Sequence, residues 1–452
     1  MQKNRLTSTG CRKFLEETIF GFSSLPNFKV LKKDVGLVGI ELEVFPFQIS
    51  KDSKSAPVQF NSFKDLLIKV ASGFDGVPVF EEEDTELLKK IIFPNGDNFQ
   101  FEPGCQIEIA INPCANLMDL ESRINFMQSI LVEITKKQGI QFAQHGINPW
   151  FGTEEVNLQV PKQRYLNLQN YLDHISPFGR MMMRLTGSLQ INLDLGKDEK
   201  TRVKRIIASN LLSPIATALF ANSLITSGTK NDLKSYRSFI WQKLDPKRTG
   251  ILPLEKICES FTKRSVIEEY LNFSLNAPLI YIEKDPLYDT PLEFTFKDWL
   301  SQDLNGHSPD ISDFANHLSL LFPEVRLRKY LELRSVDAPP REWQMIPVYF
   351  YTGLLYDNNI LEKTLDLLIP VKKEIENLRR EAVNGFLKEE LYTLSKQIMN
   401  LSIEGFKALP SSFKDEKQTH KLISFYENYT LNRKCFADDS IKFLNKNKLL
   451  TY

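Results

Sequence analysis

Five glutamates are the side chains of this sequence best suited to hold cations. They are Glu41, Glu43, Glu102, Glu108 and Glu332. Four of them lie inside short runs in which polar and apolar residues alternate, and the fifth precedes a Pro-Gly pair. Carboxylates with no cysteine or histidine beside them suit a hard, oxygen-seeking ion such as Mg²⁺ or Mn²⁺. This set therefore predicts a carboxylate-lined metal site.

The elements that must position these glutamates are strands with one buried face. The alternation covers four segments, which are Val38–Phe45, Gln106–Ile111, Ser188–Leu195 and Tyr330–Ser335. Strict alternation is typical of strands that bury one side, and it favours an antiparallel sheet over a parallel one. Glutamate is a poor strand former, and like charges on neighbouring strands repel each other. Cations on the polar face would offset that repulsion.

Other interpretations of these glutamates stay open. The four strands could form a solvated, amphipathic surface sheet. Glu102 could be an ordinary turn residue, or a bulge at Pro103-Gly104 could aim it at the same face. The phosphate-binding motifs GxxxxGK[ST] and GxGxxG are missing, as is the zinc motif HExxH. If ATP binds here, metals on a sheet have to hold its phosphates.

The overall charge argues against a nucleic-acid-binding protein. Lys+Arg and Asp+Glu both number 57 among 452 residues, so there is no basic excess. Five scattered cysteines without a CxxC pair, and no signal-peptide core at the start, predict a cytosolic protein. The uncharged stretch Ile206–Ile225 holds several polar residues, which predicts a buried core helix and no membrane span.

Apolar residues at helical spacing predict helices in four further places. These are Asn116–Lys137, Thr201–Ser227, Ile360–Asn384 and Glu389–Gly405. The second of these helices should be kinked or broken at Pro214. Polar runs at Ser50–Pro57 and Asn305–Ser312 predict loops, and neither run separates two clear domains.

Seven runs, in this order along the chain, together resemble the plant and proteobacterial type of glutamate–cysteine ligase. They are GIELEVF (39–45), FEPGCQIEIA (101–110), NPW (148–150), VPKQRYLNLQNYL (160–172), MMMRLTGSLQINLDLG (181–196), SYRSFIWQKLDPKRTG (235–250) and HLSLLFPEVRLRKYLELRSVD (317–337). Three places depart from the family pattern and bear on the acceptor amine: Cys105, the run Leu185–Ser188 and the run Gln144–Gly146.

The resemblance implies an α+β fold like the catalytic domain of glutamine synthetase, with a curled antiparallel sheet forming a funnel and helices outside. It implies a single catalytic domain over residues 1–452, with its core at 38–405 and a helical C-terminal tail at 406–452. The five glutamates would bind Mg²⁺, or Mn²⁺, which in turn holds ATP. Glu332 and Arg334 would be catalytic, with Arg334 near the transferred phosphate.

The resemblance also assigns roles to the remaining motif residues. Gln190 and Asn192 match a QxN motif expected beside ATP, and Arg184, Tyr236 and Arg237 match positions near the amino-acid substrates. The implied reaction phosphorylates the γ-carboxylate of glutamate with ATP, and cysteine then displaces phosphate to give γ-glutamylcysteine and ADP, the first step of glutathione biosynthesis. The expected partners are these small molecules, with the chain as a monomer or homodimer.

Two alternatives remain beside this function. One is a ligase of the same fold that uses a different acceptor amine. The other is a non-catalytic, regulatory relative, against which the retained carboxylates argue.

Overall fold

The central sheet is organised around β1 (Val38–Ile49), whose alternating side chains divide it into an apolar and a polar face. The computed structural model describes residues 5–21, 35–49, 55–81 and 86–444. Val38, Ile40 and Leu42 are fully buried on one face, whereas Glu41 and Glu43 point to the other. This period of two is the one that the sequence predicts.

Ten strands form one sheet in which every described pairing is antiparallel. The order across the sheet is β13 (Val325–Leu327), β14 (Leu331–Leu333), β8 (Leu189–Leu193), β1, β6 (Ile107–Cys114), β5 (Asn98–Phe101), β4 (Leu88–Ile92) and β3 (Val77–Phe80), and β2 (Ser55–Pro57) and β7 (Ile140–Ala143) also pair with β1. The strand predictions are therefore confirmed, since β1, β6, β8 and β14 fall on the four alternating segments.

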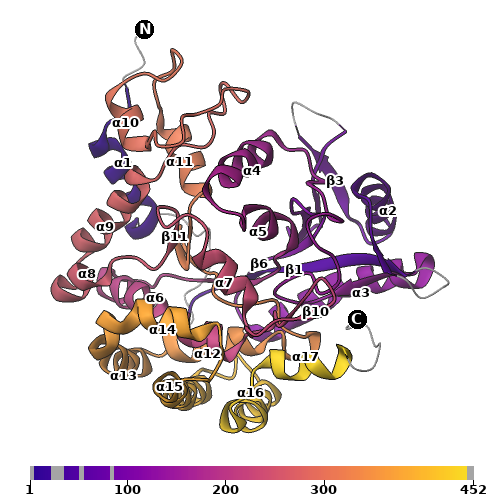
Figure 1. The fold of residues 1–452 in the computed structure, drawn as a ribbon. Coiled ribbons are helices and arrows are strands. Elements are labelled where there is room, and N and C mark those ends of the chain that lie inside the picture. The colour runs from indigo at the N-terminus through magenta and orange to yellow at the C-terminus, as the bar shows by residue number, and fades with distance from the viewer. Residues whose placement is uncertain (1–4, 22–34, 50–54, 82–85, 445–452) are drawn as a thin grey trace.

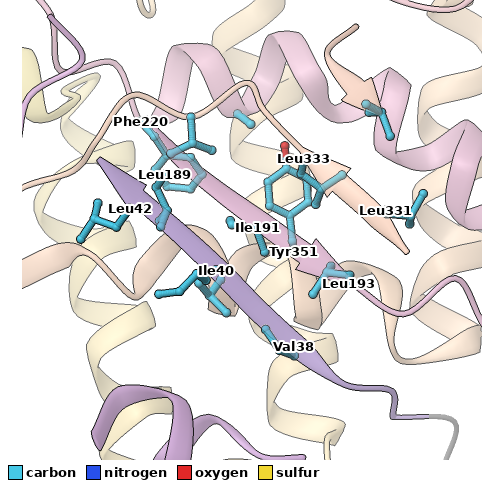
Figure 2. Packing of buried hydrophobic residues seen from close by; sticks show 14 of the residues in the cluster. Val38, Ile40, Leu42, Leu189, Ile191, Leu193, Phe220, Leu331, Leu333 and Tyr351 are labelled. Atoms are coloured by element: carbon cyan, nitrogen blue, oxygen red, sulfur yellow. The ribbon is translucent and has the colours of Figure 1, made fainter. Parts of the chain in front are cut away.

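The apolar face of the sheet packs against helices. Figure 2 shows Ile40, Ile191 and Leu333 from three neighbouring strands on this face, with Phe220 and Tyr351 of the helical layer beside them. Burial of such side chains contributes about 25 cal/mol per Å² of apolar surface. A one-residue slip of register would turn the apolar set towards the polar face, so this packing specifies the register.

Helices surround the sheet. In the first half of the chain they are α1 (Ser8–Leu15), the π-helix η1 (Glu16–Phe20), α2 (Phe60–Ser72), α3 (Leu117–Gln138), α4 (Gln163–Ile175), α5 (Gly179–Leu185) and α6 (Glu199–Leu219). In the middle they are α7 (Tyr236–Gln242), α8 (Leu254–Ser260), α9 (Lys263–Asn276), α10 (Phe296–Ser301) and α11 (Ile311–Ser319). Two short pairings lie outside the sheet: β9 (Ile225–Thr226) with β10 (Thr229–Lys230), and β11 (Thr249–Gly250) with β12 (Phe322–Pro323).

The last third of the described chain is helical, as the sequence predicts. It comprises η2 (Arg341–Trp343), α12 (Ile346–Leu355), α13 (Asn358–Leu368), η3 (Ile369–Glu374), α14 (Ile375–Ala382), α15 (Glu389–Ala408), α16 (Glu416–Asn428), η4 (Thr430–Asn432) and α17 (Phe436–Leu444). These helices, orange to yellow, lie together along one side of the molecule in Figure 1. The α+β class with an antiparallel sheet and a helical C-terminal part is confirmed.

Three predicted elements differ from the structure in detail. The single helix predicted over Ile360–Asn384 is divided into α13, η3 and α14, because Pro370 near the start of η3 lacks the N–H that a continuous α-helix needs. Helix α6 continues through Pro214 and ends at Leu219, so it is neither broken at the proline nor extended to Ser227. Its residues from Arg205 onward are buried, and this packing outweighs the one hydrogen bond that proline removes. The predicted linker at 50–57 lies outside the described residues up to position 54, and residues 55–57 are not a loop but form strand β2, which pairs with β1. Among the described residues, no helix is long and apolar enough to cross a membrane.

Candidate active site

Polar side chains form a row across the middle of the sheet, on the face opposite the core. Strand register places Glu43 directly opposite Glu108, and Glu41 opposite Gln190. On the far side of β8, Glu332 lies opposite Asn192. The structure therefore brings together the glutamates and the QxN residues that the sequence singles out, although they are up to 291 positions apart in the chain.

Amide groups hold three of these carboxylates in place. The Nδ2 of Asn192 donates to Glu41 Oε1 at 3.0 Å, and the backbone N–H of Ser188 donates to Glu43 Oε2 at 2.8 Å. Gln190 Nε2 donates to the other oxygen of Glu43 at 3.3 Å. On the next strand, Glu108 Oε1 accepts from Gln100 Nε2 at 3.2 Å. Neutral amides orient these carboxylates without cancelling their charge.

Glu102 reaches the same neighbourhood from a tight turn between β5 and β6, without the bulge that the sequence suggested. Its N–H donates to Gln106 O at 2.9 Å, and its carbonyl accepts from the N–H of Cys105. Cys105 has a φ of 72°, in the left-handed region that usually favours glycine. At Gly104 a Cβ atom would lie 2.1 Å from Arg184 O, so only glycine fits there.

The glutamates of this row disfavour each other's charge. Burial raises the pKa of Glu41, Glu102 and Glu108 above the usual range. The negative charge of at least one neighbouring glutamate raises the pKa of each of these three groups further. For Glu43, burial and the charge of Glu102 raise the pKa to about 7. A cation close to these four carboxyl groups would favour their ionised forms and oppose the upward pKa shifts.

Glu332 has different neighbours. Burial would raise its pKa, but Arg326, Arg334 and Arg328 lower it to about 2. Oε1 accepts from Arg326 Nη1 at 2.7 Å and from Arg334 Nη1 at 2.6 Å, and Oε2 contacts Arg328 Nε at 2.8 Å. A carboxylate has about four lone-pair positions, so these three guanidiniums leave one free on Oε2.

Arg334 and Arg237 stand beside the row of carboxylates. Arg334 Nη1 donates to Gln190 Oε1 at 2.5 Å, and Arg237 Nη2 donates to the backbone carbonyl of Arg334 at 3.0 Å. Buried Asp337, 3.7 Å from Arg237 Nη1, is itself held by Ser223 Oγ at 2.6 Å. The sheet thus presents guanidinium groups next to carboxylates, an arrangement that suits a phosphorylated substrate and its metal ions.

The other two predicted substrate residues have contacts of their own. Arg184 Nη2 donates to Gln169 Oε1 at 2.6 Å, on helix α4, and Arg184 Nη1 donates to Thr153 O at 3.4 Å. Tyr236 begins α7 and stacks on Phe239, with ring centroids 5.7 Å apart. No contact described here joins Arg184 or Tyr236 to the row of glutamates.

The donor set fits a divalent cation in its chemistry. All its members are oxygen donors, and neutral amide groups orient Glu41, Glu43 and Glu108. Within the described ranges, no three acidic, histidine or cysteine side chains already converge on a single point.

A pocket opens at one end of this row. It lies between β1, β6 and β8 and the turn before β14, and Glu41 and Asn192 form part of its wall. Tyr330, Asn98 and Asn112 also line it. An aromatic ring and amide groups next to a carboxylate-rich face are suited to a nucleotide base.

Several residues of the site escaped the sequence analysis. Gln100 could have been found in the sequence, because a polar residue between the apolar Phe99 and Phe101 shows the same alternation as the four predicted strands. Arg326 was also recognisable, because it alternates with Val325 and Leu327 and lies opposite Glu332. Asp337 carried no signal in the sequence, since only the folded chain brings it to Arg237.

Comparisons with known proteins place the chain among ligases. The family described as glutamate-cysteine ligase family 2 (GCS2) matches residues 37–393. The chloroplastic glutamate–cysteine ligase of Medicago truncatula is 30% identical over 437 residues, covering 90% of this chain and 83% of the relative. Its Arabidopsis thaliana counterpart is 31% identical over 387 residues, covering 82% of this chain and 70% of the relative.

Similarity to solved structures is weak. The complex of the prokaryotic ubiquitin-like protein Pup with its ligase PafA aligns with 92% of this chain and 70% of that chain, at 12% identity and a TM-score of 0.40. No functional conclusion follows from a similarity at this level.

The names of the plant relatives correct one prediction and bear out another. The predicted cytosolic location is wrong, because these relatives are chloroplastic ligases. That prediction relied on the lack of a secretory signal, which is only one kind of targeting segment. The predicted family is confirmed by a match over most of the chain and by relatives at about 30% identity. This chain belongs to glutamate-cysteine ligase family 2.

Proposed function

We propose that this protein joins the γ-carboxylate of L-glutamate to the amine of L-cysteine at the expense of ATP, forming γ-glutamylcysteine, ADP and phosphate. The observation that carries the proposal is the row of buried and half-buried glutamates beside Arg334 and Arg237. This arrangement provides oxygen ligands for metal-bound phosphates and guanidiniums for the transferred group. Membership of the ligase family supports the same reaction.

Glu41, Glu43, Glu102 and Glu108 are the proposed ligands of Mg²⁺, with Mn²⁺ as an alternative. Glu332 is a fifth candidate metal ligand. Three arginines already occupy the other lone-pair positions of its carboxylate, so it can offer one lone pair to a metal ion. Bound to these carboxylates, Mg²⁺ would neutralise the phosphate oxygens of ATP and align the γ-phosphoryl group for transfer.

Arg334 is the proposed catalytic residue of the chain itself. Its guanidinium is fixed by Glu332 and Gln190, so its direction is set before substrate arrives. A planar, permanently charged group placed in this way stabilises the charge that develops on the phosphoryl oxygens. Gln190 and Asn192 orient both Arg334 and the glutamates, and the base of ATP is proposed to lie in the pocket beside Tyr330.

Three further residues, Arg237, Arg184 and Tyr236, are proposed to bind the amino-acid substrates. Arg237 is the proposed amino-acid-binding residue with the clearest position, because it lies next to Arg334. Arg184 and Tyr236 would act from the rim of the site or through neighbouring residues. We further propose that residues 1–452 function as one catalytic domain, since the main hydrophobic cluster combines buried residues as far apart in the chain as Cys11 and Phe436.

One assay tests the reaction. Purified protein is given ATP, Mg²⁺ and glutamate together with equimolar cysteine, serine, alanine, 2-aminobutyrate, glycine and simple amines, and the products are analysed by mass. We expect γ-glutamylcysteine and ADP, with minor products from alanine or 2-aminobutyrate, because a small pocket separates near-isosteres only by about 10- to 200-fold. A dominant product from another amine would overturn cysteine as the acceptor, and AMP would reject the acyl-phosphate route.

A further inference from the structure

A narrow pocket beside Arg334 combines three arginines with two aromatic rings. Arg237 of α7, Arg334 after β14 and Arg379 of α14 line it, together with Trp241 and Phe322. Arg334 also lies over the Trp241 ring, 5.8 Å from its centroid. Arg379 comes from the C-terminal helices, so this pocket joins the helical part of the chain to the polar face of the sheet.

Three of the residues that line this pocket carry an N–H group without an acceptor. These groups are Nε of Arg237, Nε1 of Trp241 and Nη2 of Arg379, all buried and without a hydrogen-bond partner in the described part of the chain. A buried donor left unpaired costs roughly 1–3 kcal/mol, so most buried donors in native proteins have a partner. Three such donors around one pocket point to a ligand that accepts hydrogen bonds.

The charges around the pocket favour an anion. Glu324 is the one acidic side chain among its described lining residues, and it accepts from Arg379 Nε at 3.0 Å and from Ser335 Oγ at 2.8 Å. Burial would raise the pKa of Glu324, but Arg379 and its other partners keep it below the usual range, so Glu324 is ionised. Arg334 shares Glu332 with two other arginines, which leaves positive charge uncompensated.

We propose that Arg379 and Trp241 complete a subsite that binds the α-carboxylate of one of the two amino-acid substrates. A carboxylate has two oxygens, so it can accept one hydrogen bond from the free Nη2 of Arg379 and another from the free Nε of Arg237. This inference rests on the proposed function. It adds that helix α14, outside the sheet, takes part in substrate recognition, and that Glu324 positions Arg379.

The test compares Arg379→Gln and Arg379→Lys with Arg380→Gln, whose side chain is exposed on the same helix. KM is measured separately for glutamate, cysteine and ATP. Each amino acid is also paired with its analogue that lacks the α-carboxylate, which is 4-aminobutyrate for glutamate and cysteamine for cysteine. Arg379→Gln should raise KM for one amino acid by about 10- to 100-fold, because a charged hydrogen bond is lost.

The substrate pairs identify whose carboxylate is bound. If it is that of cysteine, the wild-type preference for cysteine over cysteamine shrinks in Arg379→Gln while KM for glutamate stays within about twofold. If it is that of glutamate, the preference over 4-aminobutyrate shrinks in the same way. Arg379→Lys should fall between Arg379→Gln and wild type, and Arg380→Gln should match wild type.

Trp241→Phe provides a milder variant, because it removes the N–H and keeps an aromatic ring. It should raise KM for the same amino acid by about 2- to 10-fold, even if Arg379→Gln proves too unstable to assay. Unchanged KM values for both amino acids, or a change confined to ATP, would overturn the subsite. A wild-type protein that consumes no ATP with glutamate and any amine would instead reject the proposed function.

Discussion

The buried glutamates fall into two groups according to their neighbours. Glu332 is neutralised by three arginines, whereas Glu108 has one glutamine and several other carboxylates around it. Removing Glu332 would leave the guanidinium of Arg334 without its main anchor. Removing Glu108 would relieve repulsion in the metal-free protein and take away a proposed ligand.

Glu108→Gln tests this distinction. We expect activity to fall by at least about 100-fold at low Mg²⁺ and to recover partly at high Mg²⁺, because one charged ligand is missing. Without Mg²⁺ the variant should melt at a higher temperature than wild type, since it no longer buries a carboxyl among like charges. Activity titrations and thermal melts with and without Mg²⁺ measure both effects. The exposed Glu404→Gln is the control, and near-normal activity of Glu108→Gln at low Mg²⁺ would refute the metal site.

Arg334→Lys separates transition-state stabilisation from simple binding. Lysine keeps the charge but cannot donate to Glu332 and Gln190 while also facing the phosphoryl group. We expect kcat to fall by about 100-fold or more, with KM for ATP changed by much less. Steady-state kinetics with Arg380→Lys as the matched control decide the point. A change in KM for ATP alone would make Arg334 a ground-state binder.

At the scale of elements, strand register and helix packing decide which side chains meet. Antiparallel pairing of β8 with both β1 and β14 puts Asn192 and Gln190 between the carboxylates on either side. Helix α11 shows how packing sets the properties of a side chain away from the site. His317 in its last turn is buried against Phe296, and its Nε2 lies 2.8 Å from Ser274 O on α9.

His317 should make the protein sensitive to acid. Burial and the charge of Arg248 lower the pKa of His317 to about 3, from an ordinary value of 6.5. Below pH about 6.5 the His317 side chain therefore binds a proton in the unfolded chain but stays neutral in the folded chain. The neutral, buried His317 thus costs no stability above that pH, whereas the free energy of unfolding decreases as the pH falls from 6.5 towards 3. Between pH 6.5 and 4.5 the loss should be about 2–3 kcal/mol.

Denaturant unfolding at several pH values measures this loss. In His317→Gln the slope of stability against pH should flatten over that interval, whereas the exposed His174→Gln should keep the wild-type slope. An equal slope in wild type and His317→Gln would show that another group is responsible.

At the scale of the molecule, the C-terminal helices are part of the core and of the pocket at once. Phe425 of α16 and Phe436 of α17 pack around Phe220 at the end of α6, and α14 carries Arg379 to the sheet. Helices α12 and α15 touch through glycines, since a Cβ atom on Gly405 would lie 1.9 Å from Gly353 O. The closeness of this contact fixes where the helical layer sits.

Gly405→Ala should therefore destabilise the whole protein. Helices α12 and α15 have to separate to admit one methyl group, at a cost of about 1–3 kcal/mol or more. The exposed Lys407→Ala on the same helix should change stability by less than about 0.5 kcal/mol. Unfolding midpoints in denaturant measure the difference. Equal stabilities of Gly405→Ala and wild type would mean that the two helices are not closely packed.

The sequence by itself determined the strands and most of the proposed site. Alternation of apolar and polar residues depends only on local periodicity, so β1, β6, β8 and β14 were predictable, and with them the side on which Glu41 and Glu43 lie. The positions of α3 and α15 were predictable for the same reason, whereas the break between α13 and α14 was not predicted. The end of α6 was not, because tertiary burial and not local propensity decides where that helix stops and how it tolerates Pro214.

Only the tertiary structure decided which distant residues meet. Strand pairing set Glu332 among three arginines instead of among carboxylates, and thereby gave it a pKa of about 2 while Glu43 has one of about 7. Arg379 lies 45 positions beyond Arg334 on an amphipathic helix, and nothing in its local pattern distinguishes it from the exposed Arg380. Charge, burial and missing acceptors are properties of the surroundings in space, and a one-dimensional pattern does not contain them.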